Sequence, residues 1–185
     1  DDMLGSRGEF FPTSSGFTLT SWLYLPTSPA SNTQPLWGTY GTASNWQNIV
    51  YDQGTNTLSC NENTGAGKTL NWAVPLMGMT HSTWHYLMIA YEGGASNKVF
   101  VFVDGTLINS GGTPMLGTWN NLFSTAAINV GYDQGDSNQM FEGWMDELSW
   151  SATSRQSASF VSPTEPFYAE GLYVYHAGRS APFRL

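Results

Sequence analysis

The stretch TWHYLMIAYEGGASNKVFVFVDGTLINS, from Thr83 to Ser110, decides the fold that this sequence predicts. It contains two apolar runs in which every second residue falls on the same face. The residues that share these faces are His85, Leu87, Ile89, Tyr91, Val99, Val101 and Val103. Because side chains alternate between the two faces of a β-strand, this period of two predicts two sheet strands and disagrees with the 3.6-residue period of a helix.

Two turn sequences join these strands to each other and to a third strand. Asp104-Gly105 lies between VFVFV and TLI. The two-residue hairpin turn predicted there needs positive φ at both positions, which Asp and Gly tolerate well. The longer connection before it contains Gly93, Gly94 and Asn97, which also accept left-handed backbone. Such short connections predict antiparallel pairing, because parallel strands need a long crossover.

Three motifs occur along the chain in a fixed order. They are FTLTSWLYLP at Phe17–Pro26, W-H-x-L-x-x-x-Y-x-G at Trp84–Gly93 with V-D-G at Val103–Gly105, and FEGWMDELSW at Phe141–Trp150 with its Asp146-Glu147 pair. In this order and spacing they resemble the laminin-G-like, or concanavalin A-like, β-sandwich domains, over roughly residues 8 to 160. The resemblance implies an all-β, antiparallel two-sheet jelly roll. It does not fix the function, since this fold carries lectins, hydrolases, adhesion modules and virion components.

Composition agrees with a single all-β domain. The chain has 185 residues, of which 15% are aromatic and only 11% charged. Segments rich in Ser, Thr, Asn and Gly separate the apolar runs, as expected for short strands and long surface loops. One domain of this length can bury a complete core.

The last residues differ from the rest and divide the chain into two predicted parts. Residues 1–161 form the sandwich, and residues 162–185 form a C-terminal aromatic tail that begins with Pro163 and Pro166. Tyr173–Tyr175 could act as the closing strand, because the first and last strands commonly pair in the family that the chain resembles. The tail could instead be an arm that docks on a neighbouring molecule, and both alternatives stay open.

The charge balance narrows the class of partner. The formal net charge is −8 and the isoelectric point is near 4.5, so the basic surface of a nucleic-acid-binding protein is missing. An anionic membrane surface is disfavoured for the same reason. No apolar run reaches the roughly 20 residues that a membrane span needs, so we expect no membrane insertion. The lone Cys60 cannot form an internal disulfide, which leaves the compartment open. The predicted role as a surface module is what makes an extracellular, cell-surface or virion-surface location the expected one.

One loop offers ligands for a metal ion. Asp133, Asp136 and Asn138 fall within six residues, and Glu142 follows closely. Hard oxygen ligands gathered on one loop suit Ca²⁺, and the resemblance implies calcium as well, since many relatives bind it. A polar hairpin loop without a metal explains the same residues, so Ca²⁺ is expected only as a possible cofactor.

Aromatic residues exceed what one core needs, with eight tryptophans and nine tyrosines. Sugars present apolar C–H faces to aromatic rings and hydroxyls to Asn and Asp. The ligand-binding candidates on loops and strand ends are Trp46, Trp119, Tyr132 and Asn138. The alternative is that these rings fill the core or form protein interfaces, where aromatics are also enriched.

The sequence supports a catalytic site or a zinc site less than it supports a sugar-binding site. On a regular strand Glu142 and Asp146 would lie roughly 13 Å apart, which exceeds the spacing of glycosidase carboxylates. Asp146 and Glu147 would face opposite sides unless a bulge intervenes. His81 and His85 lie four residues apart at a strand start, where the helical H-E-x-x-H geometry of a zinc site is missing. The resemblance implies a structural role for His85, because it matches a position that is usually structural in the family.

The sequence therefore predicts a non-catalytic recognition or adhesion module that binds carbohydrate. A structural virion or filament component is the first alternative, and a glycoside hydrolase of the same fold is the second. The expected partners are a glycan or glycosylated surface, or protein neighbours in an assembly that includes copies of the chain itself.

Overall fold

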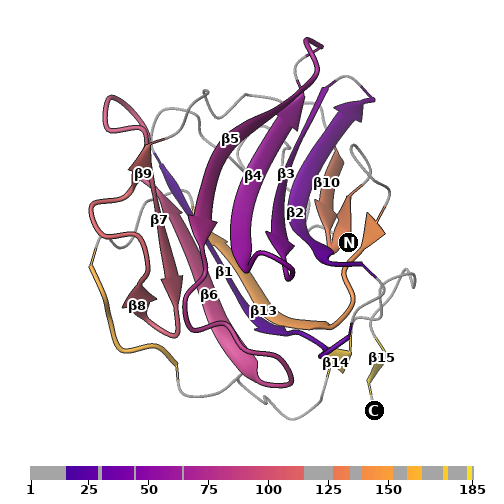
Figure 1. The fold of residues 1–185 in the computed structure, drawn as a ribbon, viewed down its shortest axis with the longest axis vertical. Helices are drawn as coiled ribbons and strands as arrows, with labels where there is room; N and C mark the ends of the chain where they lie inside the picture. Colours follow the sequence, from indigo (N-terminus) through magenta and orange to yellow (C-terminus); the bar gives the residue numbers. More distant parts are fainter. Residues whose placement is uncertain are drawn as a thin grey trace.

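The structure is a computed structural model that describes residues 16–28, 31–43, 45–63, 65–114, 127–133, 139–151, 158–163, 173–174 and 183–184. All regular elements among these residues are β-strands, and two large antiparallel sheets lie face to face (Figure 1). The prediction of an all-β, two-sheet sandwich is confirmed. No helix long and apolar enough to span a membrane occurs in the described part of the chain.

The first sheet, here sheet A, places the early and late parts of the chain side by side. In spatial order it contains β13 (Trp144–Ser151), β1 (Phe17–Tyr24), β6 (Trp84–Tyr91), β7 (Lys98–Val103) and β8 (Thr106–Leu107), and β9 (Thr113–Pro114) also pairs with β7. Both neighbours of β1 run antiparallel to it.

The second sheet, sheet B, is mostly a meander of consecutive strands. It contains β10 (Ala127–Val130), β2 (Thr33–Thr42), β3 (Asn45–Asp52), β4 (Thr57–Asn63) and β5 (Lys68–Pro75). Two short pairs complete the described elements: β11 (Tyr132–Asp133) with β12 (Gln139–Met140), and β14 (Tyr173–Val174) with β15 (Phe183–Arg184).

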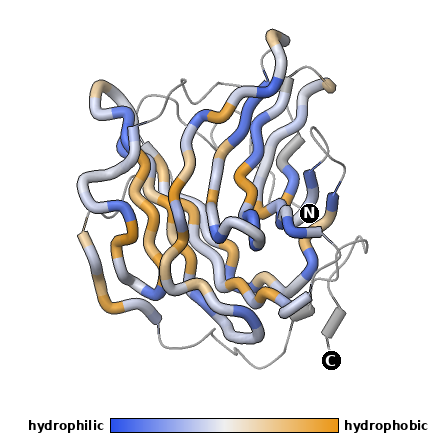
Figure 2. The backbone as a smooth tube through the Cα atoms, in the orientation of Figure 1, coloured by the Kyte–Doolittle hydropathy of each residue, from blue (hydrophilic) through white to orange (hydrophobic). Residues whose placement is uncertain are grey.

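The main core lies between the sheets, where alternate residues of each strand point inward. Figure 2 shows the hydrophobic stretches that the strands contribute. The buried inward side chains include Phe17, Leu19, Leu23, Leu87, Ile89, Val99 and Val101 from sheet A, and Ile49, Tyr51, Leu58, Cys60, Trp72 and Val74 from sheet B. Each large apolar side chain buried in this way contributes about 1.5–3 kcal/mol, and the core holds without any disulfide because the one cysteine is free.

The hairpin that joins β7 to β8 forms as predicted. Asp104 and Gly105 have φ angles of 50° and 78°, the left-handed values that the two-residue turn requires. Glycine is needed at Gly105 for a second reason: a Cβ there would overlap the carbonyl oxygen of Phe160. The turn therefore allows residues 158–163 to pass directly against it.

That segment covers part of the outer face of sheet A. Phe160 donates its backbone N–H to the carbonyl of Gly105 at 2.9 Å, and Ser159 Oγ accepts a hydrogen bond from the backbone N–H of Leu107 at 2.9 Å. The Phe160 ring lies 5.4 Å from the ring of Phe102. A second, smaller apolar cluster forms here from Met88, Ala90, Phe100 and Phe102, with Phe160 against it. Figure 1 shows the segment running beside β8.

The outer face of β1 is more closed than alternation alone indicates. Alternation along this strand directs Trp22 and Tyr24 away from the main core, and both side chains do point outward. Tyr24 is partly exposed, but only 3% of Trp22 is exposed. Trp22 lies edge-on against Tyr86, with ring centroids 5.5 Å apart. The ring of Phe160 also lies edge-on against Tyr86. The alternation of side chains along a strand tells which face of the sheet a residue points to. It does not tell which other residues cover that face.

Glycine divides one apolar run of the chain into two strands. Gly131, whose φ is 66°, separates β10 from β11. The division into residues 1–161 and 162–185 stays a prediction, because most of the tail lies outside the described residues.

Candidate functional site

Three aromatic side chains lie side by side on the outer face of sheet A, on three neighbouring strands. Tyr24 of β1 is opposite Trp144 of β13 on one side and Trp84 of β6 on the other. The ring centroid of Tyr24 lies 4.7 Å from that of Trp144 and 5.6 Å from that of Trp84, with interplanar angles of 70° and 60°. We call Trp144, Tyr24 and Trp84 the aromatic row; its rings make a corrugated apolar surface.

The aromatic row is open to solvent at its β13 end. Trp144 is 45% exposed, while Tyr24 and Trp84 are partly exposed. The chain can bring Trp144 this close because Gly143 precedes it: a Cβ at Gly143 would overlap the carbonyl oxygen of Tyr24. An exposed indole beside two further rings is a surface that can stack against an apolar ligand face.

A second row lies next to the aromatic row on the same face and contains a carboxylate. Asp146 of β13 is opposite Trp22 of β1, and Trp22 is opposite Tyr86 of β6. Asp146 is partly exposed, and its Oδ1 accepts a hydrogen bond from the backbone N–H of Glu147 at 2.8 Å. The register of β13 against β1 shifts just after Asp146, and Glu147 has a φ of 50°. A bulge thus intervenes in the Asp-Glu pair.

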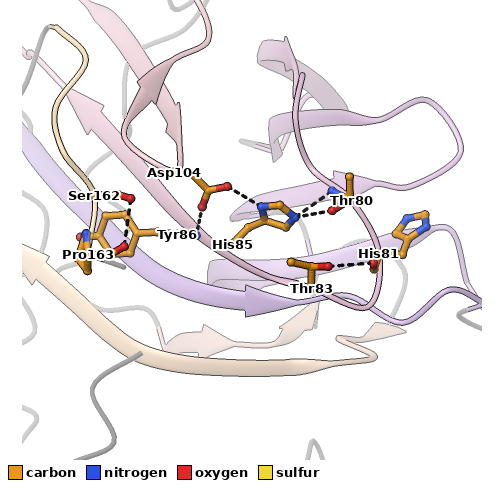
Figure 3. Close-up of polar contacts among 8 residues, drawn as sticks. All are labelled: Thr80, His81, Thr83, His85, Tyr86, Asp104, Ser162 and Pro163. Atoms are coloured by element: carbon orange, nitrogen blue, oxygen red, sulfur yellow. Dashed lines mark hydrogen bonds and ion pairs between the residues drawn. The ribbon is translucent and has the colours of Figure 1, made fainter. Parts of the chain in front are cut away.

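His85 holds the start of β6 in place (Figure 3). Its Nδ1 lies 2.7 Å from Oδ2 of Asp104, and its Nε2 lies 2.8 Å from Oγ1 and 3.1 Å from the backbone nitrogen of Thr80. Oδ1 of Asp104 accepts the backbone N–H of Tyr86 at 2.8 Å. Because the Thr80 amide can only donate, Nε2 must be the acceptor and Nδ1 must carry the proton.

This network supports the aromatic row. The Thr80 hydroxyl, the His85 imidazole and the Asp104 carboxylate follow one another in the order of a nucleophilic triad. However, Nε2 of His85 also accepts a hydrogen bond from the backbone N–H of Thr80. The arrangement therefore secures the loop before β6. Ser82 adds a backbone hydrogen bond to the carbonyl of Leu25 at 2.8 Å, so the chain enters β6 with Trp84 next to Tyr24. The geometry agrees with the expectation of a structural His85.

The predicted calcium ligands are only partly within the described residues. Asp133 ends β11 and is 3% exposed. Glu142 accepts a hydrogen bond from the backbone N–H of Ser31 at 3.2 Å through Oε1 and donates its own N–H to Oε1 of Gln34 at 2.7 Å. Asp136 and Asn138 lie outside the described residues. Within the described ranges, no group of three or more His, Cys, Asp or Glu side chains is close enough to hold a metal ion.

The two predicted ligand-binding residues that the structure describes, Trp46 and Tyr132, do not lie in the aromatic row. Trp46 belongs to β3 of sheet B and is only 3% exposed, so its ring is covered. Tyr132 pairs with Met140 in the short β11–β12 ribbon and is partly exposed. Trp119 and Asn138 fall outside the described part of the chain.

A line of polar side chains crosses the inner face of sheet B beside the core. Thr39 is opposite Gln47, and Gln47 is opposite Glu62, whose Oε2 accepts a hydrogen bond from Asn71 Nδ2 at 3.4 Å. All four are at most 8% exposed, and Oγ1 of Thr39 and both amide atoms of Gln47 have no hydrogen-bond partner. Burial raises the pKa of Glu62, an effect that the Asn71 hydrogen bond partly offsets. We call these four residues the buried polar line.

The residues of the aromatic row were present in the motifs but were not assigned a binding role from sequence. Alternation alone sends Tyr24 outward, Trp84 begins its motif, and Trp144 is the fourth residue of FEGWMDELSW. What the sequence lacks is the register, which puts these three rings opposite one another. The sequence signal for this site is an aromatic residue at the neighbouring end of each of three strands. That signal can be recognised only when the order of the strands in the sheet is known.

Comparison with known proteins gives the family and the fold. The family model described as the concanavalin A-like lectin/glucanases superfamily matches residues 4–159. A carbohydrate-binding module of Ruminococcus gnavus IT-sialidase, CBM40, bound to α2,3-sialyllactose, is similar in structure, with a TM-score of 0.57, 13% identity, and coverage of 78% of this chain and 80% of that one.

Trypanosoma rangeli sialidase in complex with sialic acid is also similar, with a TM-score of 0.51 and 14% identity. The match covers 77% of this chain but only 22% of the sialidase, so it concerns a small part of that enzyme. No curated protein matches the chain in sequence.

Proposed function

We propose that this chain, which belongs to the concanavalin A-like lectin/glucanases superfamily, is a non-catalytic module that binds carbohydrate through the aromatic row. The single observation behind the proposal is the exposed indole of Trp144, held beside Tyr24 and Trp84. The similar module from Ruminococcus gnavus was observed with a bound oligosaccharide, which supports carbohydrate in general as the ligand here.

The chemistry of the aromatic row suits a sugar. Neighbouring strands lie about 4.8 Å apart, so rings on three strands follow one another at a spacing comparable to the length of a pyranose residue. A sugar ring has an apolar C–H face and polar edges, and a tryptophan ring beside polar side chains complements both. The preformed rings also lose little conformational freedom on binding.

The test is binding of the purified chain to a glycan array, followed by calorimetry with the best ligand. Trp144→Ala should weaken binding by at least about 10-fold, since truncating a tryptophan that anchors a ligand commonly costs about 2 kcal/mol or more. Leu70→Ala is the matched control, because Leu70 is 49% exposed but lies on β5 of sheet B. Wild-type protein that binds no glycan contradicts the function, and an equal loss in both variants contradicts the location.

The alternatives drawn from the sequence predict other results. A structural virion or filament component would self-assemble in sedimentation experiments and bind no glycan. A glycoside hydrolase would release reducing sugar from polysaccharides, and Glu142→Gln or Glu147→Gln would abolish that release. The proposed module does neither.

Location and calcium complete the proposal. We place the protein outside the cell, on a cell surface or on a virion surface, where glycans are displayed. Asp133, Asp136, Asn138 and Glu142 are the residues that would bind Ca²⁺. If they do, millimolar Ca²⁺ should raise the melting temperature and a chelator should reverse the change; an unchanged melting temperature removes calcium from the proposal.

A further inference from the structure

Asp146 is placed beside the aromatic row by the register of β13. Trp144 pairs with Tyr24, Met145 with Leu23 and Asp146 with Trp22, so the strand is regular across these residues. Trp144 and Asp146 therefore point to the same face, about 6.6 Å apart along the strand at about 3.3 Å per residue. A ligand that rests on the Trp144 ring lies within reach of the Asp146 carboxylate.

The two carboxylate oxygens of Asp146 have different surroundings. Oδ1 accepts the backbone N–H of Glu147 at 2.8 Å, at the point where Glu147 turns into left-handed backbone. Within the described residues, no hydrogen bond reaches Oδ2. The Ser21 hydroxyl lies 3.2 Å from the backbone carbonyl oxygen of Asp146 and 2.9 Å from that of Trp22, and its one proton is shared between these two acceptors. One oxygen thus fixes the orientation of the carboxylate, and the other remains available on a partly exposed side chain.

This arrangement has a definite chemical preference. A carboxylate only accepts hydrogen bonds, and bonds to a charged acceptor are roughly twice as strong as neutral ones. Sugar hydroxyls can donate to it while the C–H face of the same sugar rests on the indole. A carboxylate, sulfate or phosphate group on the ligand would meet Asp146 with like charge, on a chain whose formal net charge is already −8.

We propose that Asp146 sets the specificity of the aromatic row, by accepting hydrogen bonds from the free hydroxyls of a neutral sugar residue stacked on Trp144. This inference rests on the proposed carbohydrate-binding function. It goes further, because it selects neutral glycans over acidic ones and names the group that makes the selection.

The experiment compares the wild-type chain with Asp146→Asn and Asp146→Ala on an array of neutral, sialylated and sulfated oligosaccharides, with affinities measured by calorimetry. Asn keeps the Oδ1 acceptor for the Glu147 amide and replaces the charged Oδ2 with an N–H donor. We expect Asp146→Asn to weaken binding of the best neutral ligand by at least about 10-fold, as for loss of a hydrogen bond to a charged group, with an unchanged melting temperature. Asp146→Ala should lose binding to a similar extent and also lower the melting temperature, because the bulge amide loses its acceptor.

A second measurement separates recognition from folding. Deoxy analogues of the best neutral ligand, each lacking one hydroxyl, should include at least one that weakens binding to the wild type but not to Asp146→Asn. If Asp146→Asn binds like the wild type while Trp144→Ala does not, the role of Asp146 is wrong and the carbohydrate-binding function stands. A wild type that prefers sialylated or sulfated ligands also overturns the role of Asp146. If no oligosaccharide binds the wild type, both proposals fail together.

Discussion

At the scale of single residues, Glu62 links stability to pH. Its pKa is raised by burial, so the folded state holds the proton more tightly than the unfolded state does. The contribution of this tighter proton binding to the free energy of unfolding is fully present below the ordinary glutamate pKa of about 4.3. It is lost as the pH rises through the higher pKa of the folded state. We predict that the contribution of this residue to the melting temperature falls between pH 4 and neutrality.

Glu62→Gln is the variant that tests this prediction. Gln remains neutral at every pH and its Oε1 can still accept the Asn71 hydrogen bond, so the variant should match the wild type near pH 4 and exceed its melting temperature near pH 7. Thermal unfolding followed by circular dichroism at a series of pH values measures both. If the melting temperatures of the two proteins changed in parallel with pH, Glu62 would not titrate in this range.

Asp104 and the Thr80 amide together determine which nitrogen of His85 carries the proton. Asp104→Asn keeps an acceptor for the Tyr86 amide and suits the left-handed backbone, but it offers His85 Nδ1 an N–H donor. Either that pair is lost or the tautomer reverses, in which case Nε2–H meets the Thr80 N–H. We predict a loss of about 1–2 kcal/mol in the free energy of unfolding, measured in urea. Nitrogen chemical shifts of His85 report the tautomer, and His81→Ala, at an exposed position, should change neither.

At the scale of elements, Gly105 couples the β7–β8 hairpin to residues 158–163. Gly105→Ala adds a Cβ both to left-handed backbone and against the Phe160 carbonyl. Gly65→Ala is the matched control, because Gly65 has a φ of 94° but nothing within 4 Å of its added Cβ. We expect Gly105→Ala to lower the melting temperature by several degrees more than Gly65→Ala, given about 2–4 °C per kcal/mol for a chain of this size. Equal decreases would mean that backbone strain alone accounts for the loss.

The same scale shows what the sequence could predict. Alternation and turn chemistry predicted β6, β7 and the connections next to them, because each depends on neighbouring residues. The Asp104-Gly105 turn was predicted down to the sign of its φ angles. The pairing of β13 with β1 and the bulge at Glu147 depend on residues more than a hundred positions apart, which no local pattern specifies. The aromatic row arises from that pairing and so was missed.

Burial was the other limit on prediction. Trp46 has the same residue type as Trp144 and also lies on a strand, yet 3% of one and 45% of the other is exposed. The sequence pointed to Trp46 as a binding candidate and did not single out Trp144. Distinguishing them requires knowing what covers each sheet face, and that is a property of the whole fold.

At the scale of the whole molecule, Cys60 reports global unfolding. Its thiol is fully buried in the main core, and burial together with nearby Glu62 raises its pKa well above the ordinary value. Because the thiolate is the reactive form, we predict that the native protein does not react with iodoacetamide at pH 8. Labelling measured by mass spectrometry across a urea series should follow the loss of circular dichroism. Rapid labelling without urea would contradict the packed core around Cys60.

The docking of Phe160 over Phe102 has a practical meaning for anyone who trims this chain. The family match stops at residue 159, so a fragment cut there would omit the ring that shields Met88, Phe100 and Phe102. Without Phe160, these side chains would form an exposed apolar patch that favours aggregation. The fragment ending at residue 159 should therefore precipitate under conditions in which a fragment ending at residue 163 stays in solution.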